Sequence, residues 1–350
     1  MRQAIVTMAV SGCAAIGGCA TQTSPTYTAS DVKVATATDK AAGTSLVTKT
    51  SRFEIHADPW LSLHHLAFHY ARNDSGLRVR GYTPLTHDDL DAFTPDVVAA
   101  FEPVAKAYEP YYEMSLLRSA PLRYSSVAIV MGGVDSLEDP ALKQALIDVM
   151  PVYKTHFWDR HEAAAQRLID SFSADLHHHG DDMARRLTDY LESDWSSEPM
   201  RVDIVPYASW AGAYTGTRPV NHLTIGALQD MALDSSFETL FHEASHASPM
   251  SDQLDAAEKA AFAASGLDMN RYWHALLWYA SGRAAMETLG EPYQPIYVTS
   301  GRLTDPKWGP VYQSLDAVWD EHDTLQARAI AAAKRVVALQ AGTPEENRSD

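Results

Sequence analysis

The sequence contains few cysteines and few cations. Its 350 residues include two cysteines, Cys13 and Cys19, and 28 Lys and Arg against 45 Asp and Glu, which gives a formal net charge of −17. Because both cysteines lie at the N-terminal end, the rest of the chain has no thiol for a disulfide or a thiolate metal site. No stripe of Lys and Arg occurs that could displace counterions from phosphates, and this argues against DNA or RNA as a partner.

The N-terminal segment also lacks the length of a membrane span. The run from Ala4 to Gly18 is apolar or small and follows Arg2, and it predicts a secretory signal over residues 1–18. The run ends in Ile-Gly-Gly before Cys19, which resembles the bacterial lipobox, with Ile where Leu is more usual. This resemblance implies an exported protein, anchored by a lipid on Cys19 to the membrane at the periplasmic side of the bacterial cell envelope. A plain signal peptide cut near Ala20 is the alternative.

Composition divides the rest of the chain into regions. A stretch rich in Thr, Ala and Ser has too few large apolar side chains to offset its ordering entropy, and it predicts a flexible tether. The next region shows mostly helical patterning, with one short strand expected over Tyr124–Val130. His64, His65 and His69 are expected on the packing face of a helix that begins at Asp58-Pro59. The predicted regions are a tether over 19–51, a helical region over 52–200, a catalytic region over 201–341 and a disordered tail over 342–350.

Short strands are predicted from Met200 onward. Residues 201–205 alternate apolar and polar side chains, and the runs 209–217 and 219–226 add one or two further strands separated by Gly and Pro turns. Helical patterning returns from Ser235. The composite is an α+β fold, mostly helical, with a small sheet directly before one key helix.

That helix carries a motif with metal chemistry. It contains His-Glu-x-x-His, and histidines four positions apart lie on one helix face, so the rings of His242 and His246 can reach one zinc ion. Glu243 then lies beside the open position of the metal, where it can take a proton from water. These three residues are the predicted centre of the site.

The flanks of the motif predict an amphipathic helix. Ser235 and Glu238 have the spacing of a capping box, and Pro249 ends the helix soon after the second histidine. The helix is expected to bury an apolar stripe and to hold the His/Glu/His set toward a cleft. The stripe consists of Phe237, Leu240, Phe241 and Ala244.

The motif, the strands before it and the helix after it resemble zincin metallopeptidases over roughly residues 200–290. The third histidine of metzincins is missing, since Asp252 stands in its place and Pro249 replaces the glycine. The resemblance therefore implies a gluzincin-like arrangement, in which a later helix supplies the third ligand and a substrate peptide lies along an edge strand. The runs Phe-His-Glu-Ala-Ser-His and Trp-His-Ala-Leu-Leu-Trp-Tyr also look like those of uncharacterised bacterial secreted proteins or lipoproteins.

Three residues compete for the third ligand position. His274 lies among Trp273, Leu277 and Trp278 on a predicted helix that spans about 271–289, and it is the first choice. Glu287 is what the gluzincin resemblance implies, although Arg283 four positions earlier makes a surface ion pair equally natural. Asp252 is the remaining candidate.

The sequence says less about the residues that would assist the zinc ligands and the general base. Tyr279, Arg283 and Tyr297 are candidates to donate a hydrogen bond to the oxyanion that forms when water attacks a carbonyl. A carboxylate is expected on one zinc histidine, and Glu238 is the nearest choice unless it only caps the helix.

Together these features predict a zinc-dependent hydrolase, and a metallopeptidase first of all, with a peptide or protein substrate. Two alternatives stay open. A non-catalytic envelope lipoprotein would use zinc as a structural or partner-binding element, and a structural zinc takes four protein ligands. An amidase would act on a cell-wall linkage instead of a peptide.

Overall fold

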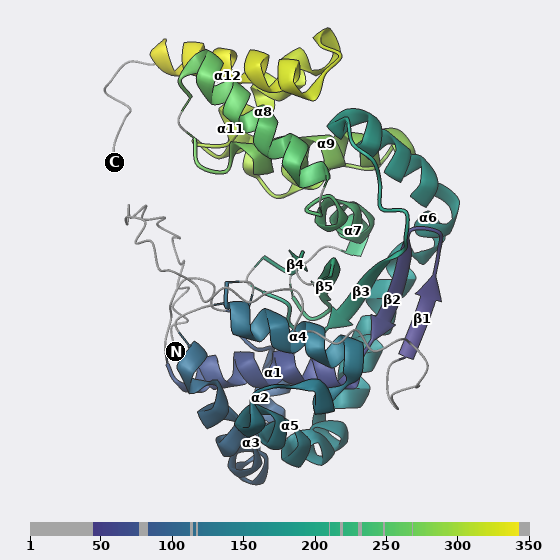
Figure 1. The fold of residues 1–350 in the computed structure, drawn as a ribbon, viewed down its shortest axis with the longest axis vertical. Coiled ribbons are helices and arrows are strands. Elements are labelled where there is room, and N and C mark those ends of the chain that lie inside the picture. Colours follow the sequence, from purple (N-terminus) through teal and green to yellow (C-terminus); the bar gives the residue numbers. More distant parts are fainter. Residues whose placement is uncertain are drawn as a thin grey trace, which may run out of the picture. The chain divides into compact units, whose positions relative to one another are not determined.

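The computed structural model of the chain describes residues 45–76, 83–112, 115–116, 118–209, 211–217, 220–229, 233–247, 249–267 and 269–342. The predicted signal sequence, Cys19, most of the predicted tether and the tail from residue 343 lie outside these residues. The described chain is mostly helical with one small mixed sheet, which is the α+β architecture expected from the sequence (Figure 1).

The sheet has five strands in the order β1-β2-β3-β5-β4. The three central strands run parallel, while β1 and β4 pair antiparallel at the two edges. β1 lies inside the segment predicted to be a tether, so the ordered chain begins earlier than composition suggested, because pairing with β2 orders it. The strands are β1 Ser45–Lys49, β2 Phe53–Ala57, β3 Met200–Val205, β4 Ala213–Gly216 and β5 His222–Gly226.

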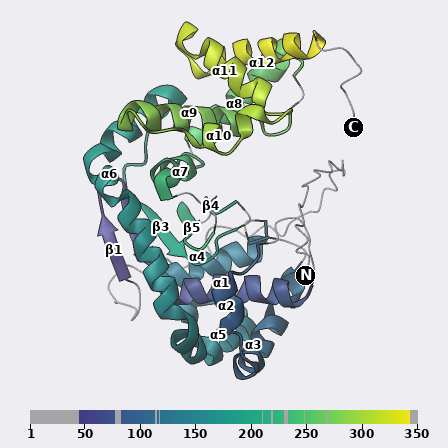
Figure 2. The ribbon, with the colours of Figure 1, turned by 180° about the vertical axis from the view of Figure 1, so that it is seen from behind.

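A long helical crossover joins β2 to β3. α1 packs against β3, and α3, α4 and α5 pack around α1. The long helix α6 then contacts β2 and β3 from the side opposite to α1, as Figures 1 and 2 show from two directions. These helices are α1 Pro59–Asp74, α2 His87–Ala92, α3 Pro95–Tyr108, α4 Ala120–Gly132, α5 Pro140–Tyr153 and α6 Asp159–Leu191.

The helices after β5 build the rest of the fold on the α6 side. α9 packs against α6 and α7, and α8 packs against α12 and α9. None of the helices in the described residues has both the length and the apolar character needed to cross a bilayer. The helices are α7 Ser236–Ala244, α8 Met250–Ser265, α9 Tyr272–Leu289, α10 Ile296–Thr299, α11 Gly309–Val318 and α12 Leu325–Ala341.

The strand predicted over Tyr124–Val130 is wrong, because this segment is the body of α4. The hydroxyl of Ser119 accepts a hydrogen bond from the Leu122 amide, and Pro121 occupies the first turn, so the chain is set up to start a helix there. A short apolar run such as Val127–Val130 is compatible with either structure. Capping and packing on α1 select the helix.

The sheet separates two apolar cores. Val202 and Ile204 of β3 face the core built with α6, α7 and α9. The opposite side of the sheet meets α1, where His64, His65 and His69 are all buried, as the packing-face prediction required. The site described next lies in the first of these regions, where α7 is held between the sheet and α9 (Figures 1 and 2).

Candidate metal centre

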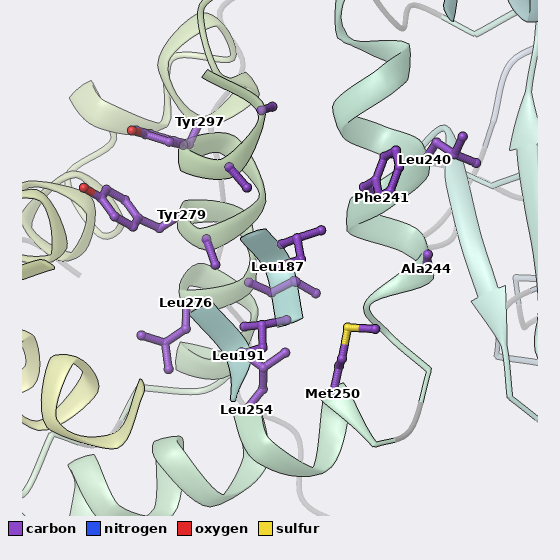
Figure 3. Close-up of a cluster of buried hydrophobic side chains, with 14 of the residues drawn as sticks. Leu187, Leu191, Leu240, Phe241, Ala244, Met250, Leu254, Leu276, Tyr279 and Tyr297 are labelled. Atoms are coloured by element: carbon purple, nitrogen blue, oxygen red, sulfur yellow. The ribbon is translucent and has the colours of Figure 1, made fainter. Parts of the chain in front are cut away.

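α7 is anchored by the apolar stripe that the sequence predicted. Phe237, Leu240, Phe241 and Ala244 are all buried. Leu240, Phe241 and Ala244 belong to the cluster of apolar side chains in Figure 3, where Leu187 and Leu191 of α6 lie close by. All nine residues of α7 are buried, so the opposite face, which carries His242 and Glu243, is covered by neighbouring elements and does not open toward a cleft as expected.

The helix ends earlier than the sequence indicated. α7 stops at Ala244, and His246 lies in the following turn, where its amide donates to the Glu243 carbonyl. His242 and His246 still lie side by side, with ring centroids 5.0 Å apart. The early end does not separate the two histidines, because a single tight turn continues the helical path.

α9 brings a third imidazole to this pair. His274 lies on the first turn of α9, and its ring centroid is 5.2 Å from that of His242 and 5.3 Å from that of His246. One nitrogen from each of the three rings lies within 4.8 Å of the other two. The residue ranked first for the third ligand position is therefore the one that the tertiary structure places beside the motif.

The distance between two of the three nitrogens fits a shared metal ion. The Nε2 atoms of His242 and His274 are 3.3 Å apart. Two nitrogens bound tetrahedrally to one zinc at about 2.0–2.1 Å are separated by about 3.3–3.4 Å. A hydrogen bond between the neutral rings of His242 and His274 would give a similar separation. Such a bond does not explain why the ring of His246 lies beside both of them.

Burial keeps the three histidines in the uncharged form that binds metals. Desolvation, with the charges of His246, His274 and Arg302, holds the pKa of His242 well below its usual range. Burial lowers the pKa of His246 to about 4, and burial with neighbouring positive charge lowers that of His274 to about 3. At neutral pH all three rings are uncharged, which is the form that binds metals. His246 and His274 are partly exposed, so the cluster is not sealed.

Glu243 is held by the edge of the sheet. The hydroxyl of Thr215 in β4 lies 2.8 Å from a carboxylate oxygen of Glu243 and 2.7 Å from its backbone carbonyl. Burial raises the pKa of this carboxyl to about 7, although the bond from Thr215 opposes the shift. Glu243 is thus buried and oriented by β4, and no pattern in the sequence near α7 indicates this contact.

A hydroxyl, not the expected carboxylate, supports His242. Its Nδ1 lies 3.3 Å from the Oγ of Ser281 on α9, and that hydroxyl donates to the Leu277 carbonyl at 2.9 Å. With its proton committed to the carbonyl, the Ser281 oxygen is free to accept from His242 Nδ1. This arrangement leaves Nε2 of His242 as the nitrogen facing the cluster.

The capping-box prediction for Glu238 is wrong. Ser235 is the N-cap residue, but its side chain makes no capping hydrogen bond. The Glu238 carboxylate instead accepts from the hydroxyl of Tyr293 at 2.6 Å and from the amide of Ile296 at 2.9 Å. Glu238 therefore ties the segment after α9 to α7, and it belongs neither to a cap nor to the histidines.

The other two ligand candidates lie elsewhere. Glu287 pairs with Arg186 and Arg283, both at 2.7 Å, and accepts from Tyr190. Asp252 is exposed in the first turn of α8, and neither acid belongs to the histidine cluster.

The three candidate oxyanion donors are also engaged elsewhere. Tyr279 donates to Asp316, Arg283 pairs with Glu287 and Asp320, and the Tyr297 ring stacks on Tyr312. Figure 3 shows Tyr279 and Tyr297 pointing away from α7.

Two residues near the cluster were not singled out from the sequence as part of a site. Trp278 stacks on the His242 ring with centroids 3.8 Å apart. The guanidinium of Arg302 lies over the Trp278 ring, 5.3 Å from its centroid. The position of Trp278 one helical turn after His274 is a signal that sequence reasoning could have used. Arg302 lies in a short irregular segment, and no local pattern points to it.

Comparison of the chain with protein-family models, with curated proteins and with solved structures gave no significant match. The function therefore has to be inferred from the geometry of the site.

Proposed function

We propose that this protein is a zinc-dependent hydrolase that cleaves peptide bonds. The observation that carries the proposal is the convergence of one nitrogen each from His242, His246 and His274 within 4.8 Å, with Glu243 following His242 in the chain. The chemistry of the donor set favours zinc, since three imidazoles are a common set for catalytic zinc.

A catalytic role is favoured over a structural one by the number of ligands. A structural zinc site takes four protein ligands, whereas the cluster has three members in the part of the chain that the structure describes. A zinc ion held by three histidines would supply a Lewis acid with one position left for water or substrate. Two of the three rings are partly exposed, which suits a site that must admit a substrate.

Glu243 supplies the acid–base chemistry in this proposal. Its carboxylate takes a proton from the attacking water and passes it to the leaving amine. Thr215 holds the carboxylate in place through its hydroxyl, so Glu243 does not have to be ordered during the reaction. His242, His246 and His274 stay neutral and hold the metal.

A peptide is favoured as substrate by the position of β4. This strand is at the edge of the sheet and packs against α7. An extended peptide can add to an edge strand through main-chain hydrogen bonds, and pairing with β4 would bring it past Thr215 and Glu243.

The decisive experiment compares Glu243→Gln with the wild type and with Glu238→Gln. Glu238 is the matched control, because it is a buried glutamate on the same helix that is bonded to Tyr293 instead of facing the cluster. We expect Glu243→Gln to keep its zinc and to lose turnover of a peptide library by several orders of magnitude. Unchanged turnover in Glu243→Gln removes Glu243 from the mechanism.

Metal content tests the same proposal independently of a substrate. Elemental analysis of the purified protein is expected to give one zinc per chain, and His242→Ala is expected to lose it. A protein without zinc, or a His242→Ala variant that keeps it, contradicts the metal assignment.

We also propose that the protein is exported and lipid-anchored at Cys19 in the cell envelope. The support is the N-terminal apolar run that ends at this cysteine, in a segment outside the described residues. Mass spectrometry of the mature N-terminus tests this. A diacylated Cys19 is expected, while an unmodified N-terminus near Ala20 indicates a plain signal peptide.

A further inference from the structure

Arg302 is a half-buried cation beside the candidate metal centre. It begins a single 3-10 turn, Arg302–Thr304, that follows α10. Its guanidinium lies 5.3 Å from the centroid of the Trp278 ring, and Trp278 stacks directly on His242. The positive charge of Arg302 is close enough to lower the pKa of both His242 and His274.

The pairing of Arg302 differs from that of five other half-buried arginines in the described residues, each of which forms a salt bridge with a carboxylate. Arg302 takes part in none of the salt bridges found there, and its buried Nε has no hydrogen-bond partner. A buried donor on a charged group is costly to leave unpaired, and the guanidinium therefore has hydrogen-bonding capacity that the described residues do not use. The half-buried arginines that pair with carboxylates are Arg52 with Asp181, Arg160 with Asp89, Arg186 with Asp182 and Glu287, Arg201 with Asp203, and Arg283 with Glu287 and Asp320.

The excess of acidic residues in the chain makes the lack of a carboxylate partner for Arg302 more informative. With 45 Asp and Glu against 28 Lys and Arg, a carboxylate from the protein itself is the expected neighbour of a half-buried guanidinium. Arg328 gives the contrasting case: its Nε donates to the backbone carbonyls of Trp319 and His322 while the guanidinium lies over the Trp319 ring. Arg302 has the same kind of indole contact without such acceptors among the described residues.

We propose that Arg302 binds the free C-terminal carboxylate of a peptide substrate and so directs cleavage to bonds near that end. The planar guanidinium matches a carboxylate through two parallel hydrogen bonds. A terminal carboxylate lies at a fixed distance from the last peptide bonds, whereas the distance of a side-chain carboxylate varies with its rotamer. The inference rests on the proposed hydrolase function for the reaction, but the binding of the carboxylate can be tested without it.

The experiment uses two peptide pools of the same random sequences, one ending in a carboxylate and one in a carboxamide. Cleavage by the zinc-loaded full chain is followed by mass spectrometry. Binding is followed separately by the thermal shift of zinc-loaded Glu243→Gln. We expect the wild type to prefer the acid pool by about tenfold to a hundredfold, which is the range for a charge-assisted hydrogen bond. Arg302→Met should remove this preference, and Arg302→Lys should retain part of it.

Arg328→Met is the matched control, because it also removes a cation over an indole ring, and the acid-to-amide ratio should not change in it. If Arg302→Met slows both pools equally, Arg302 stabilises the oxyanion, and the carboxylate proposal is overturned. Equal cleavage of both pools by the wild type overturns it as well. If no peptide is cleaved, the hydrolase proposal fails, but the thermal shift still tests the binding of the carboxylate. A larger thermal shift with the acid pool than with the amide pool, lost in Arg302→Met, supports the inference. Equal thermal shifts with the two pools refute it.

Discussion

A single hydroxyl group, on Thr215 of β4, contacts both the backbone carbonyl of Glu243 at 2.7 Å and its carboxylate at 2.8 Å. This side chain connects the edge strand of the sheet to the end of α7. The strand that an extended substrate would pair with is thus the strand that orients the proposed general base. Under the proposed function, Thr215 would couple substrate binding to proton transfer.

Thr215→Val is expected to lower turnover without loss of metal. The change keeps the shape of the side chain and removes the hydroxyl, so the buried Glu243 carboxylate loses a donor worth about 1–3 kcal/mol. We expect a fall in kcat of about tenfold or more in the peptide-library assay, with zinc content unchanged. Thr215→Ser restores the hydroxyl and should restore most of the turnover. A Thr215→Val enzyme as active as the wild type would show that Glu243 is oriented by other contacts.

The third ligand can be identified by metal content alone. His274→Ala is expected to lower zinc affinity by several orders of magnitude, because a site with two protein ligands holds the ion weakly. Glu287→Gln is the comparison, since this residue pairs with Arg186 and Arg283 and should leave the zinc content at one per chain. The reverse pattern, with zinc lost in Glu287→Gln and kept in His274→Ala, would restore the gluzincin-like ligand set.

Acid should destabilise the fold through the buried histidines of α1. Burial lowers the pKa of His69 to about 3, whereas the ring titrates near 6.5 in the unfolded chain. Below pH 6.5 the unfolded state therefore binds a proton that the folded state excludes, so stability is full above this pH and falls as the pH drops toward 3. The contribution of His69 amounts to about 2 kcal/mol between pH 7 and pH 5.

The measurement is urea unfolding of the wild type and His69→Phe at both pH values. The phenylalanine ring keeps the contacts with Phe68 and Tyr207 but does not titrate. The variant should lose about 2 kcal/mol less than the wild type on going from pH 7 to pH 5. Equal losses would mean that His69 takes up its proton in the folded state as well.

Gly282→Ala should destabilise the protein although alanine favours helices. Gly282 lies on α9 next to Ser281, and an added Cβ would lie 2.7 Å from the Cβ of Pro295 and 2.7 Å from the Tyr297 ring. The crowding should lower the free energy of unfolding by about 1–3 kcal/mol. Gly180→Ala in α6 is the control, because there the nearest atom to the added Cβ is the flexible end of Leu176 at 3.3 Å and the next is the Phe241 ring at 3.8 Å, an ordinary contact. We expect no loss of stability in thermal unfolding.

Local patterns in the sequence were sufficient for several features. The apolar stripe of α7 required a helix with one buried face, and His242, Glu243 and His246 follow from spacing along that helix. β3 was recognised from its alternation, and the helix around His274 from its periodicity. These features depend on residues close together in the chain, so the sequence alone contains them.

Other features depend on contacts between distant segments, and there the sequence misled or was silent. Glu238 has the spacing of a cap, yet Tyr293 and Ile296 compete successfully for its carboxylate. The segment Tyr124–Val130 was predicted to be a strand, but capping at Ser119 and packing on α1 make it helical. Local propensity is worth only a few tenths of a kcal/mol per residue, so tertiary packing overrides it.

The sequence by itself determined that two histidines four positions apart flank an acid, a spacing that brings both rings to one side wherever the chain follows a helical path. Only the tertiary structure decided that His274 completes the set, that Thr215 holds Glu243 and that Arg302 lies beside Trp278. These relations span many residues of chain, and their distances are set by how α9 and β4 pack on α7. Packing sums many weak contacts from all over the molecule, so no short segment encodes it.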